Sequence, residues 1–437
     1  MLLICMLQLG EFQKVDEVAS EALALSRSHG LDFLRMMTLG SFTPVFAFRG
    51  NHQEAHAYTE EAIELAKRFR NPWAEAMSLL LEGHAERGKQ NWRAAEAAFT
   101  RAEYVFEGTY RTPQQQHVHL EPHVCITYWD EDGRLVIRSS TQVPFHIRRM
   151  VAPLIGLPVK QIRVIKPRIG GGFGNKQEMI LEDLCAHLSL VTGRPVRMEY
   201  TRRQEFTSSR SRHPNVIHYK LGITDDNVVA ADLYLIGDTG AYGTHGLTVQ
   251  MVGGFKGLTL YNAPNSRFVC DVVYTNTPPA GAFRGYGAMQ CQFGVEVLME
   301  EIAEDLGLDV VEFKRTNWLK VGEPMLLSRV LGEGREGYEQ ALQTSGLAIC
   351  VNAGLQATDF YAKRQAHQRQ EGPIRKGIGV AVSMHGSGIA GLDMAAATLK
   401  MNDDGSFNLL IGATDLGTGS DTILAQIATE VLGIQVD

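Results

Sequence analysis

The stretch Gly170-Gly171-Gly172-Phe173-Gly174-Asn175-Lys176 determines how the central part of this chain is interpreted. Three consecutive glycines carry no side chain, so the backbone there can adopt positive φ and approach a bulky ligand closely. Ile162–Ile165 upstream predicts a strand, and residues 179–191 downstream have apolar side chains at helical spacing. This strand–loop–helix junction can hold an anionic group at backbone N–H groups and a helix N-terminus. A structural turn explains the glycines equally well, because neither the Walker pattern nor G-x-G-x-x-G is matched.

The composition limits the class of protein. A length of 437 residues allows about two to four domains, and a net charge of −7 argues against non-specific nucleic-acid binding. The six cysteines are scattered and no C-x-x-C occurs, so we expect reduced thiols in a cytoplasmic protein rather than a zinc or iron–sulfur site. The sequence shows no signal-peptide pattern and no apolar run of about 18 residues, so we expect no membrane span.

Residues 1–103 carry a repeated helical pattern. Phe12, His52 and Trp92 open similar stripes and lie forty residues apart, and glycines occupy the expected turns. A fixed period of this size predicts a helical solenoid that resembles tetratricopeptide-like repeats, with an irregular helical bundle as the alternative. The solenoid would offer a surface to a protein partner.

Beyond residue 103 the pattern changes to mixed α/β. Short β-branched runs predict strands at 136–138, 196–200, 228–234 and 272–274, and apolar periodicity predicts helices at 144–155, 179–191 and 293–306. The polar stretch 363–376 predicts a linker. Strands are expected at 377–384 and 395–401, and residues 402–405 form a hairpin signal. The chain is therefore predicted to be multidomain, with helical repeats at 1–103 and α/β regions at 104–362 and 377–437.

Four further motifs accompany the glycine run. They are Gln-His-Val-His-Leu-Glu-Pro-His at 116–123, Ser-Thr-Gln at 140–142, Ala-Gly-Ala-Phe-Arg-Gly-Tyr-Gly at 280–287, and Gly-Ala-Thr-Asp-Leu-Gly-Thr-Gly at 412–419. Together and in this order, the five motifs resemble the molybdenum-binding subunit of the xanthine dehydrogenase/aldehyde oxidase family. The resemblance implies that residues 104–362 are a first molybdopterin-binding domain and that residues 377–437 begin a second.

The resemblance also implies a cofactor and its contacts. In that family molybdenum is held by a pterin, and the protein contacts the ligands of the metal rather than the metal itself. Gln142, Phe173 and Arg284 would lie beside those ligands, with Gln142 hydrogen-bonded to an oxygen. The other implied contacts are Gly172, Gly174, Gly417 and Gly419 to the cofactor, and Gln177 and Tyr286 to the substrate. The resemblance implies a pterin dinucleotide, and which dinucleotide form it is stays open.

Several positions depart from the xanthine-oxidising members of that family. Gln177 stands where those members carry Glu, and Val252 stands where they carry a substrate-orienting Arg. Val380-Ala381 stands where they carry Phe-Thr, and Thr418 stands where many members carry Gln. The resemblance therefore implies an N-heterocycle or an aldehyde as the substrate, without favouring a purine.

The resemblance places the general-base Glu of the family beyond residue 437, and iron–sulfur clusters and FAD on partner subunits. We therefore expect a hydroxylase large-subunit fragment that is inactive alone. The alternative is a helical-repeat interaction module fused, between about residues 102 and 108, to an inactive molybdopterin-domain remnant. The His117/His119/His123 segment predicts no protein-ligated metal, because no carboxylate or Cys pattern completes a site.

Overall fold

The computed structural model describes residues 95–328, 339–386 and 395–436, together with scattered positions between residues 20 and 65. Most of the predicted helical repeat, including Phe12, His52 and Trp92, lies outside the described residues. Positions 23–28 and 95–101 are helical, but these two segments do not establish a forty-residue period. None of the helices among these described positions is long and apolar enough to cross a membrane.

The chain divides into two compact units. One comprises the N-terminal part up to Phe106 with residues 220–232 and 263–267, and the other comprises the remaining residues. Every predicted site residue belongs to the second unit.

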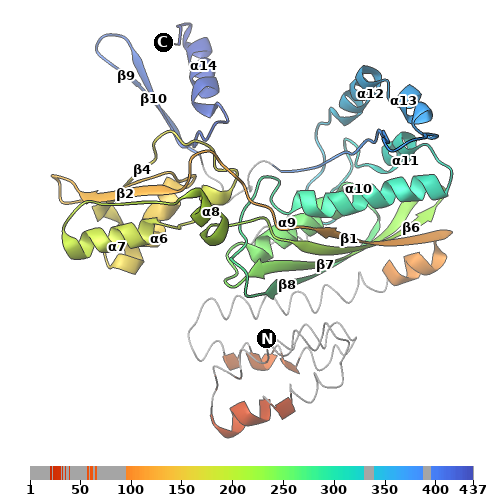
Figure 1. Cartoon of the computed structure of the whole chain (residues 1–437), viewed down its shortest axis with the longest axis horizontal. Coiled ribbons are helices and arrows are strands. Elements are labelled where there is room, and N and C mark those ends of the chain that lie inside the picture. The colour runs from red at the N-terminus through yellow and green to blue at the C-terminus, as the bar shows by residue number, and fades with distance from the viewer. Residues whose placement is uncertain are drawn as a thin grey trace. The chain divides into compact units, whose positions relative to one another are not determined.

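The described residues form two four-stranded sheets and one hairpin, with helices between the strands (Figure 1). The strands are β1 Tyr104–Thr112, β2 Val124–Trp129, β3 Leu135–Ser139, β4 Ile162–Ile165, β5 Val196–Glu199, β6 Asn215–Thr224, β7 Asn227–Gly240, β8 Asn265–Tyr274, β9 Ala397–Met401 and β10 Phe407–Ile411. The α-helices are α6 Pro144–Ile155, α7 Glu182–Thr192, α8 Arg202–Ser208, α9 Gly246–Thr259, α10 Ala288–Asp305, α11 Val310–Asn317, α12 Leu347–Thr358, α13 Phe360–Ala366 and α14 Ser420–Leu432. Two short 3-10 turns, η1 Val159–Gln161 and η2 Asn175–Gln177, flank β4 and the glycine run.

The first sheet has the order β4-β3-β2-β5 and carries the glycine loop at the end of β4. β3 pairs with β4 in parallel, whereas β2 runs antiparallel to β3 and β5. α6 and α7 bury Ile147, Val151 and Cys185 against the sheet. α6 has Pro144 in its first turn and ends at Gly156, which adopts the left-handed conformation. Proline is favoured at the start of a helix and glycine just after its end.

The second sheet has the order β1-β6-β7-β8. Within the second unit, α9 packs on α10, and glycines let α10 approach the strands closely. A Cβ at Gly294 would lie 3.1 Å from the Tyr110 ring and 3.2 Å from the Tyr219 ring. This packing fixes α10, whose N-terminus follows the motif at 280–287.

Most predicted elements are confirmed, although the helix predicted at 293–306 already begins at Ala288. Three further predictions need correction. The helix predicted at 179–191 begins at Glu182, because the Glu182 carboxylate accepts the N–H groups of Ile180 and Leu181 and so holds these two residues outside the helix. Residues 377–384 form no strand in the described structure, since side chains rather than a neighbouring strand bind their backbone groups. β9 pairs instead with β10, through the predicted 402–405 turn.

The third correction concerns the predicted linker. α13 runs to Ala366 and therefore occupies the first residues of the 363–376 stretch. The mixed α/β pattern expected from residue 104 begins with β1, Tyr104–Thr112.

Candidate functional site

The glycine loop is the point where three of the four companion motifs meet. A Cβ at Gly170 would lie 2.6 Å from Glu121 Cβ, and a Cβ at Gly174 would lie 2.6 Å from the Ala282 carbonyl oxygen. A Cβ at Gly172 would collide with the Gln142 side chain. The glycines are therefore required by close packing, and Gly171 and Gly174 also have positive φ, 87° and 104°.

Glu121 and Lys176 anchor the two ends of the loop. The Glu121 carboxylate accepts the Gly170 N–H at 2.8 Å and the Lys176 ammonium at 2.9 Å. Lys176 Nζ also donates to the Glu121 carbonyl, and its side chain is fully buried. Burial lowers the pKa of Lys176, which the Glu121 carboxylate partly offsets. The predicted helix N-terminus is not part of this anchor, because α7 begins only at Glu182, six residues after Lys176.

Gln142 is held by its oxygen. Its Oε1 accepts the Gly174 N–H at 2.9 Å, and its backbone N–H donates to the Lys176 carbonyl at 2.8 Å. No described residue accepts a hydrogen bond from its Nε2, which leaves the amide N–H₂ as a neutral donor. The hydrogen bond from Gln142 to an oxygen on molybdenum stays a prediction.

Phe173 and Arg284 lie together. The Arg284 N–H donates to the Phe173 carbonyl at 2.8 Å, Phe173 has a positive φ of 55°, and its side chain is 38% exposed. The Arg284 guanidinium is exposed, and no described residue bonds it. It therefore remains a cationic multi-donor at the rim of the loop.

A three-layer stack supports the 280–287 segment. The His117 ring stacks on the Phe283 ring at 3.9 Å between centroids, and the Arg212 guanidinium lies 4.0 Å from the centroid of that ring. His117 Nε2 donates to the Ala282 carbonyl at 2.7 Å, and Arg212 donates to the Arg284 carbonyl at 2.7 Å. Burial lowers the pKa of His117 to about 4, so the ring is neutral at neutral pH.

The residues present fit an anionic pterin cofactor. The free donors are the Gln142 amide, the Arg284 guanidinium and the N–H groups of Gly171 to Phe173, which donate to no described residue. The buried His117 Nδ1, which is an acceptor because Nε2 carries the proton, also has no partner among the described residues. Unpaired donors around a loop free of side chains are what a large anionic group requires.

The two implied substrate residues lie in different environments. Gln177 is exposed on η2, and no described residue bonds its side chain. The next residue, Glu178, is paired with Arg210 at 2.6 Å. Tyr286 is half-buried, and its hydroxyl lies 2.6 Å from His245 Nδ1 and 2.7 Å from Thr248 Oγ1.

The fourth motif does not join the glycine loop. Gly417 and Gly419 lie in a turn whose N–H groups donate to the Asp415 carboxylate, and no described atom lies within 4 Å of a Cβ built on either glycine. A hydrogen bond from Lys166 Nζ to the Asp415 carbonyl, at 2.7 Å, links this turn to the segment before the glycine run.

A buried carboxylate joins the histidine segment, which the sequence did not reveal. The Thr201–Gln204 capping box starts α8 and places Glu205 beside His119 and His123. These three offer a metal-ligand set, but each is already paired: His123 Nδ1 lies 2.9 Å from Glu205 Oε1, and Asn175 Nδ2 donates to His119 Nε2 at 3.0 Å. Although burial opposes it, pairing with His123 lowers the pKa of Glu205 to about 2. The cluster is therefore a structural support of Asn175 and the loop.

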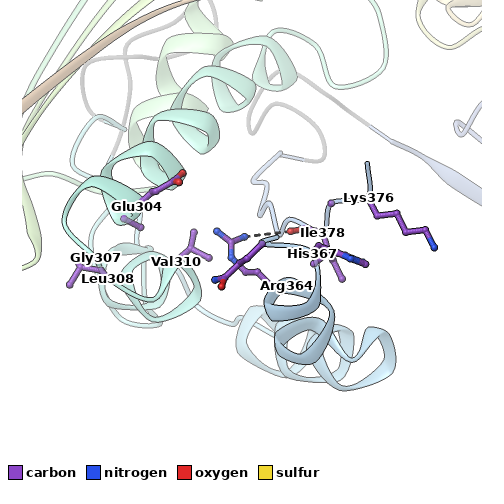
Figure 2. A pocket seen from close by; sticks show the side chains of 11 residues that line it. Glu304, Gly307, Leu308, Val310, Arg364, His367, Lys376 and Ile378 are labelled. Atoms are coloured by element: carbon purple, nitrogen blue, oxygen red, sulfur yellow. Dashed lines mark hydrogen bonds between the residues drawn. The ribbon is translucent and has the colours of Figure 1, made fainter. Parts of the chain in front are cut away.

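A separate hollow lies at the far end of α10 (Figure 2). It is lined by Glu304, Arg364 and His367, among others, and holds about 440 Å³. The Arg364 guanidinium there already bonds Glu300 and the Ile378 carbonyl. None of its lining residues belongs to the five motifs.

The sequence interpretation missed the residues that orient the site from outside the motifs. Arg210 and Arg212 lie in the run Ser209-Arg210-Ser211-Arg212-His213-Pro214, whose charge density beside a turn was an available signal. His245 follows the glycine-rich stretch Gly240–Gly243 and precedes a helix, but its partners are 67 and 41 residues away. Only the fold brings them together.

Two family models match the chain. Both are described as a molybdopterin cofactor-binding domain, one over residues 79–318 and the other over residues 353–437. The first match therefore begins inside the stretch assigned to helical repeats.

Relatives agree with these matches. The protein named probable hypoxanthine oxidase XdhD of Escherichia coli (strain K12) is 38% identical over 339 residues, which cover 77% of this chain and 35% of that protein. The xanthine dehydrogenase molybdenum-binding subunit of Escherichia coli O157:H7 is 36% identical, with 77% and 44% covered. The chain thus spans less than half the length of these relatives.

A solved structure shares the fold. The aldehyde oxidoreductase from Desulfovibrio gigas superposes with a TM-score of 0.70 and 29% identity, covering 77% of this chain and 36% of that one. The glycine loop, the anchored Gln142 and the free donors stand within the first matched domain, whose cofactor is molybdenum with molybdopterin. The chain belongs to the molybdopterin cofactor-binding family of the xanthine dehydrogenase and aldehyde oxidoreductase large subunits.

Proposed function

We propose that this chain is part of a molybdenum hydroxylase large subunit, which hydroxylates an N-heterocycle or an aldehyde with oxygen from water. The observation that carries the proposal is the anchored Gln142. Its oxygen accepts a hydrogen bond from the Gly174 N–H, while its N–H₂ remains free. A bound molybdenum–pterin group supplies the two-electron redox chemistry. Iron–sulfur and flavin subunits, acting in the cytoplasm, would carry the electrons away.

The residues of this chain then bind and orient. Gln142 donates a neutral hydrogen bond, Arg284 supplies positive charge for anionic parts of the cofactor, and the glycines admit it without side-chain collision. Gln177 and Tyr286 border the space for the substrate.

Cofactor loading tests the proposal. We expect the purified chain, produced in cells that make molybdopterin, to contain molybdenum and pterin in equal amounts. Gly172→Ala should lower this content at least tenfold, because the added Cβ would collide with Gln142. Gly354→Ala is the matched control, since its Cβ meets no described atom within 4 Å. A folded wild-type protein without molybdenum or pterin would contradict the proposal and leave the interaction-module alternative.

A further inference from the structure

His245 lies between Tyr286 and Glu178, two residues of the site. It lies at the start of α9, with Nδ1 2.6 Å from the Tyr286 hydroxyl and Nε2 3.5 Å from Glu178 Oε1. Glu178 is also bonded by Arg210 Nε at 2.6 Å and by Thr244 Oγ1 at 3.0 Å. The carboxylate is therefore committed to protein partners.

The Glu178 carboxylate favours one arrangement of donors in this network. Glu178 accepts only, so His245 presents its Nε2–H to the carboxylate and keeps an acceptor at Nδ1. The Tyr286 O–H then donates to Nδ1, and Thr248 Oγ1 at 2.7 Å supplies a second partner to the same hydroxyl. The carboxylate thus favours the tautomer of His245 in which Nδ1 accepts the Tyr286 O–H.

The network also fixes the plane of the Tyr286 ring. The His245 and Tyr286 rings meet edge to face at 87°, with centroids 5.7 Å apart. The backbone of Tyr286 is tied by its N–H to the Phe283 carbonyl, and Arg284 of the same loop binds the Phe173 carbonyl. A Tyr286 ring held in this way within the 280–287 segment is suited to border a flat ligand.

We propose that His245 is a positioning residue that orients Tyr286 to receive a planar aromatic substrate in preference to an aliphatic aldehyde. The proposal rests on the proposed function for its substrate, but the orientation of the ring does not. A flat heterocycle gains from a ring held in one plane, because no rotamer freedom is lost on binding. A small aliphatic aldehyde gains little from it.

The pH dependence follows from the groups around His245. These are Glu178 in the segment after the loop, Arg210 after α8, His146 on α6, and His213. Burial lowers the pKa of His245, with Glu178 acting against this and Arg210 and His146 adding to it. At neutral pH, Nδ1 of the neutral ring accepts a hydrogen bond from the Tyr286 hydroxyl. Protonation of the ring at acid pH removes that acceptor.

The first test is kinetic and uses the holoenzyme with its partner subunits. His245→Phe should raise KM for an aromatic N-heterocycle about fivefold, the effect of one lost hydrogen bond, with kcat changed less than twofold. His245→Asn, whose Oδ1 can replace the Nδ1 acceptor, should recover most of the loss. In a Tyr286→Phe background, His245→Phe should add nothing, and the rise of KM at acid pH should be absent. Equal effects in both backgrounds, or an equal loss with an aliphatic aldehyde, would overturn the proposal.

The second test needs no activity. In this chain labelled with 3-fluorotyrosine, the ¹⁹F signal assigned through Tyr286→Phe should show slow ring rotation in the wild type and averaging in His245→Phe. An averaged wild-type signal would refute the positioning role. A pinned ring in a protein without molybdenum would refute only the proposed function.

Discussion

Gln142 shows how one side chain can be split between structure and function. Its oxygen accepts the Gly174 N–H, which ties it to the loop, while its nitrogen stays free. The amide is suited to this because it carries an acceptor and donors at one terminus without a charge. Gly172 makes this position of Gln142 possible, because the Gln142 side chain fills the space that a Cβ at Gly172 would occupy.

Replacing this amide separates the two functions. In Gln142→Glu one oxygen can still accept the Gly174 N–H, but the donor becomes an anion that faces an anionic cofactor. We expect the variant to fold with wild-type far-UV circular dichroism and to lose at least tenfold of its molybdenum and pterin content. Gln177→Glu, the same change at an exposed residue of η2, should retain the cofactor. Wild-type loading in Gln142→Glu would refute the role of its nitrogen.

At the scale of elements, α10 connects two parts of the site. Its N-terminus follows Tyr286, and Gln292, Glu296 and Glu300 recur every fourth residue along one face. These side chains hold residues 378–384: Glu296 accepts the Val382 N–H at 2.9 Å, and its partner Lys314 donates to the Val380 carbonyl at 2.8 Å. This ladder is why the segment is extended yet forms no strand.

Breaking the buried pair should release that segment. Lys314 is 1% exposed and lies 2.9 Å from Glu296, so Lys314→Met leaves a buried carboxylate without its cation. We expect a loss of about 3–5 kcal/mol in the free energy of unfolding and faster hydrogen exchange at residues 378–384, measured by mass spectrometry. Arg134→Ala, which breaks the exposed pair with Asp132, is the control and should cost at most about 1 kcal/mol. Unchanged exchange in Lys314→Met would show that the ion pair does not hold the segment.

At the scale of the whole molecule, the site depends on buried neutral histidines. His117, His119 and His213 are each at least nine-tenths buried, and burial lowers the pKa of each to about 4. The unfolded chain therefore binds more protons than the folded one between about pH 6.5 and 4. Below the unfolded pKa, each group weakens the fold as the pH falls.

Stability should accordingly fall on mild acidification. The free energy of unfolding should drop by up to about 1.4 kcal/mol per pH unit for each of the three histidines as the pH falls from 6.5 toward 4. Glu205, with its pKa lowered to about 2, contributes stability that is lost only at more acid pH. Urea unfolding at pH 7.5, 6.5 and 5.5 measures the slope, and the exposed His187→Gln variant should leave it unchanged. A flat profile over this range would contradict the burial of neutral rings.

The sequence by itself determined the elements and the ancestry. Ile162–Ile165 and Pro144–Ile155 form as predicted, because period and end residues are local properties. The five motifs also sufficed for the family. The proposed repeat at 1–103 remains a prediction, since most of it lies outside the described residues.

Only the tertiary structure decided which polar side chains are hydrogen-bonded within the protein and which remain free. Gln177 and Glu178 are adjacent, yet Arg210 and His245 engage the second and no described residue engages the first. Glu205 completes the histidine cluster from 82 residues away, and α10 rather than a strand holds residues 378–384. The physical reason is that hydrogen-bond pairing and burial depend on neighbours in space, which local periodicity does not encode.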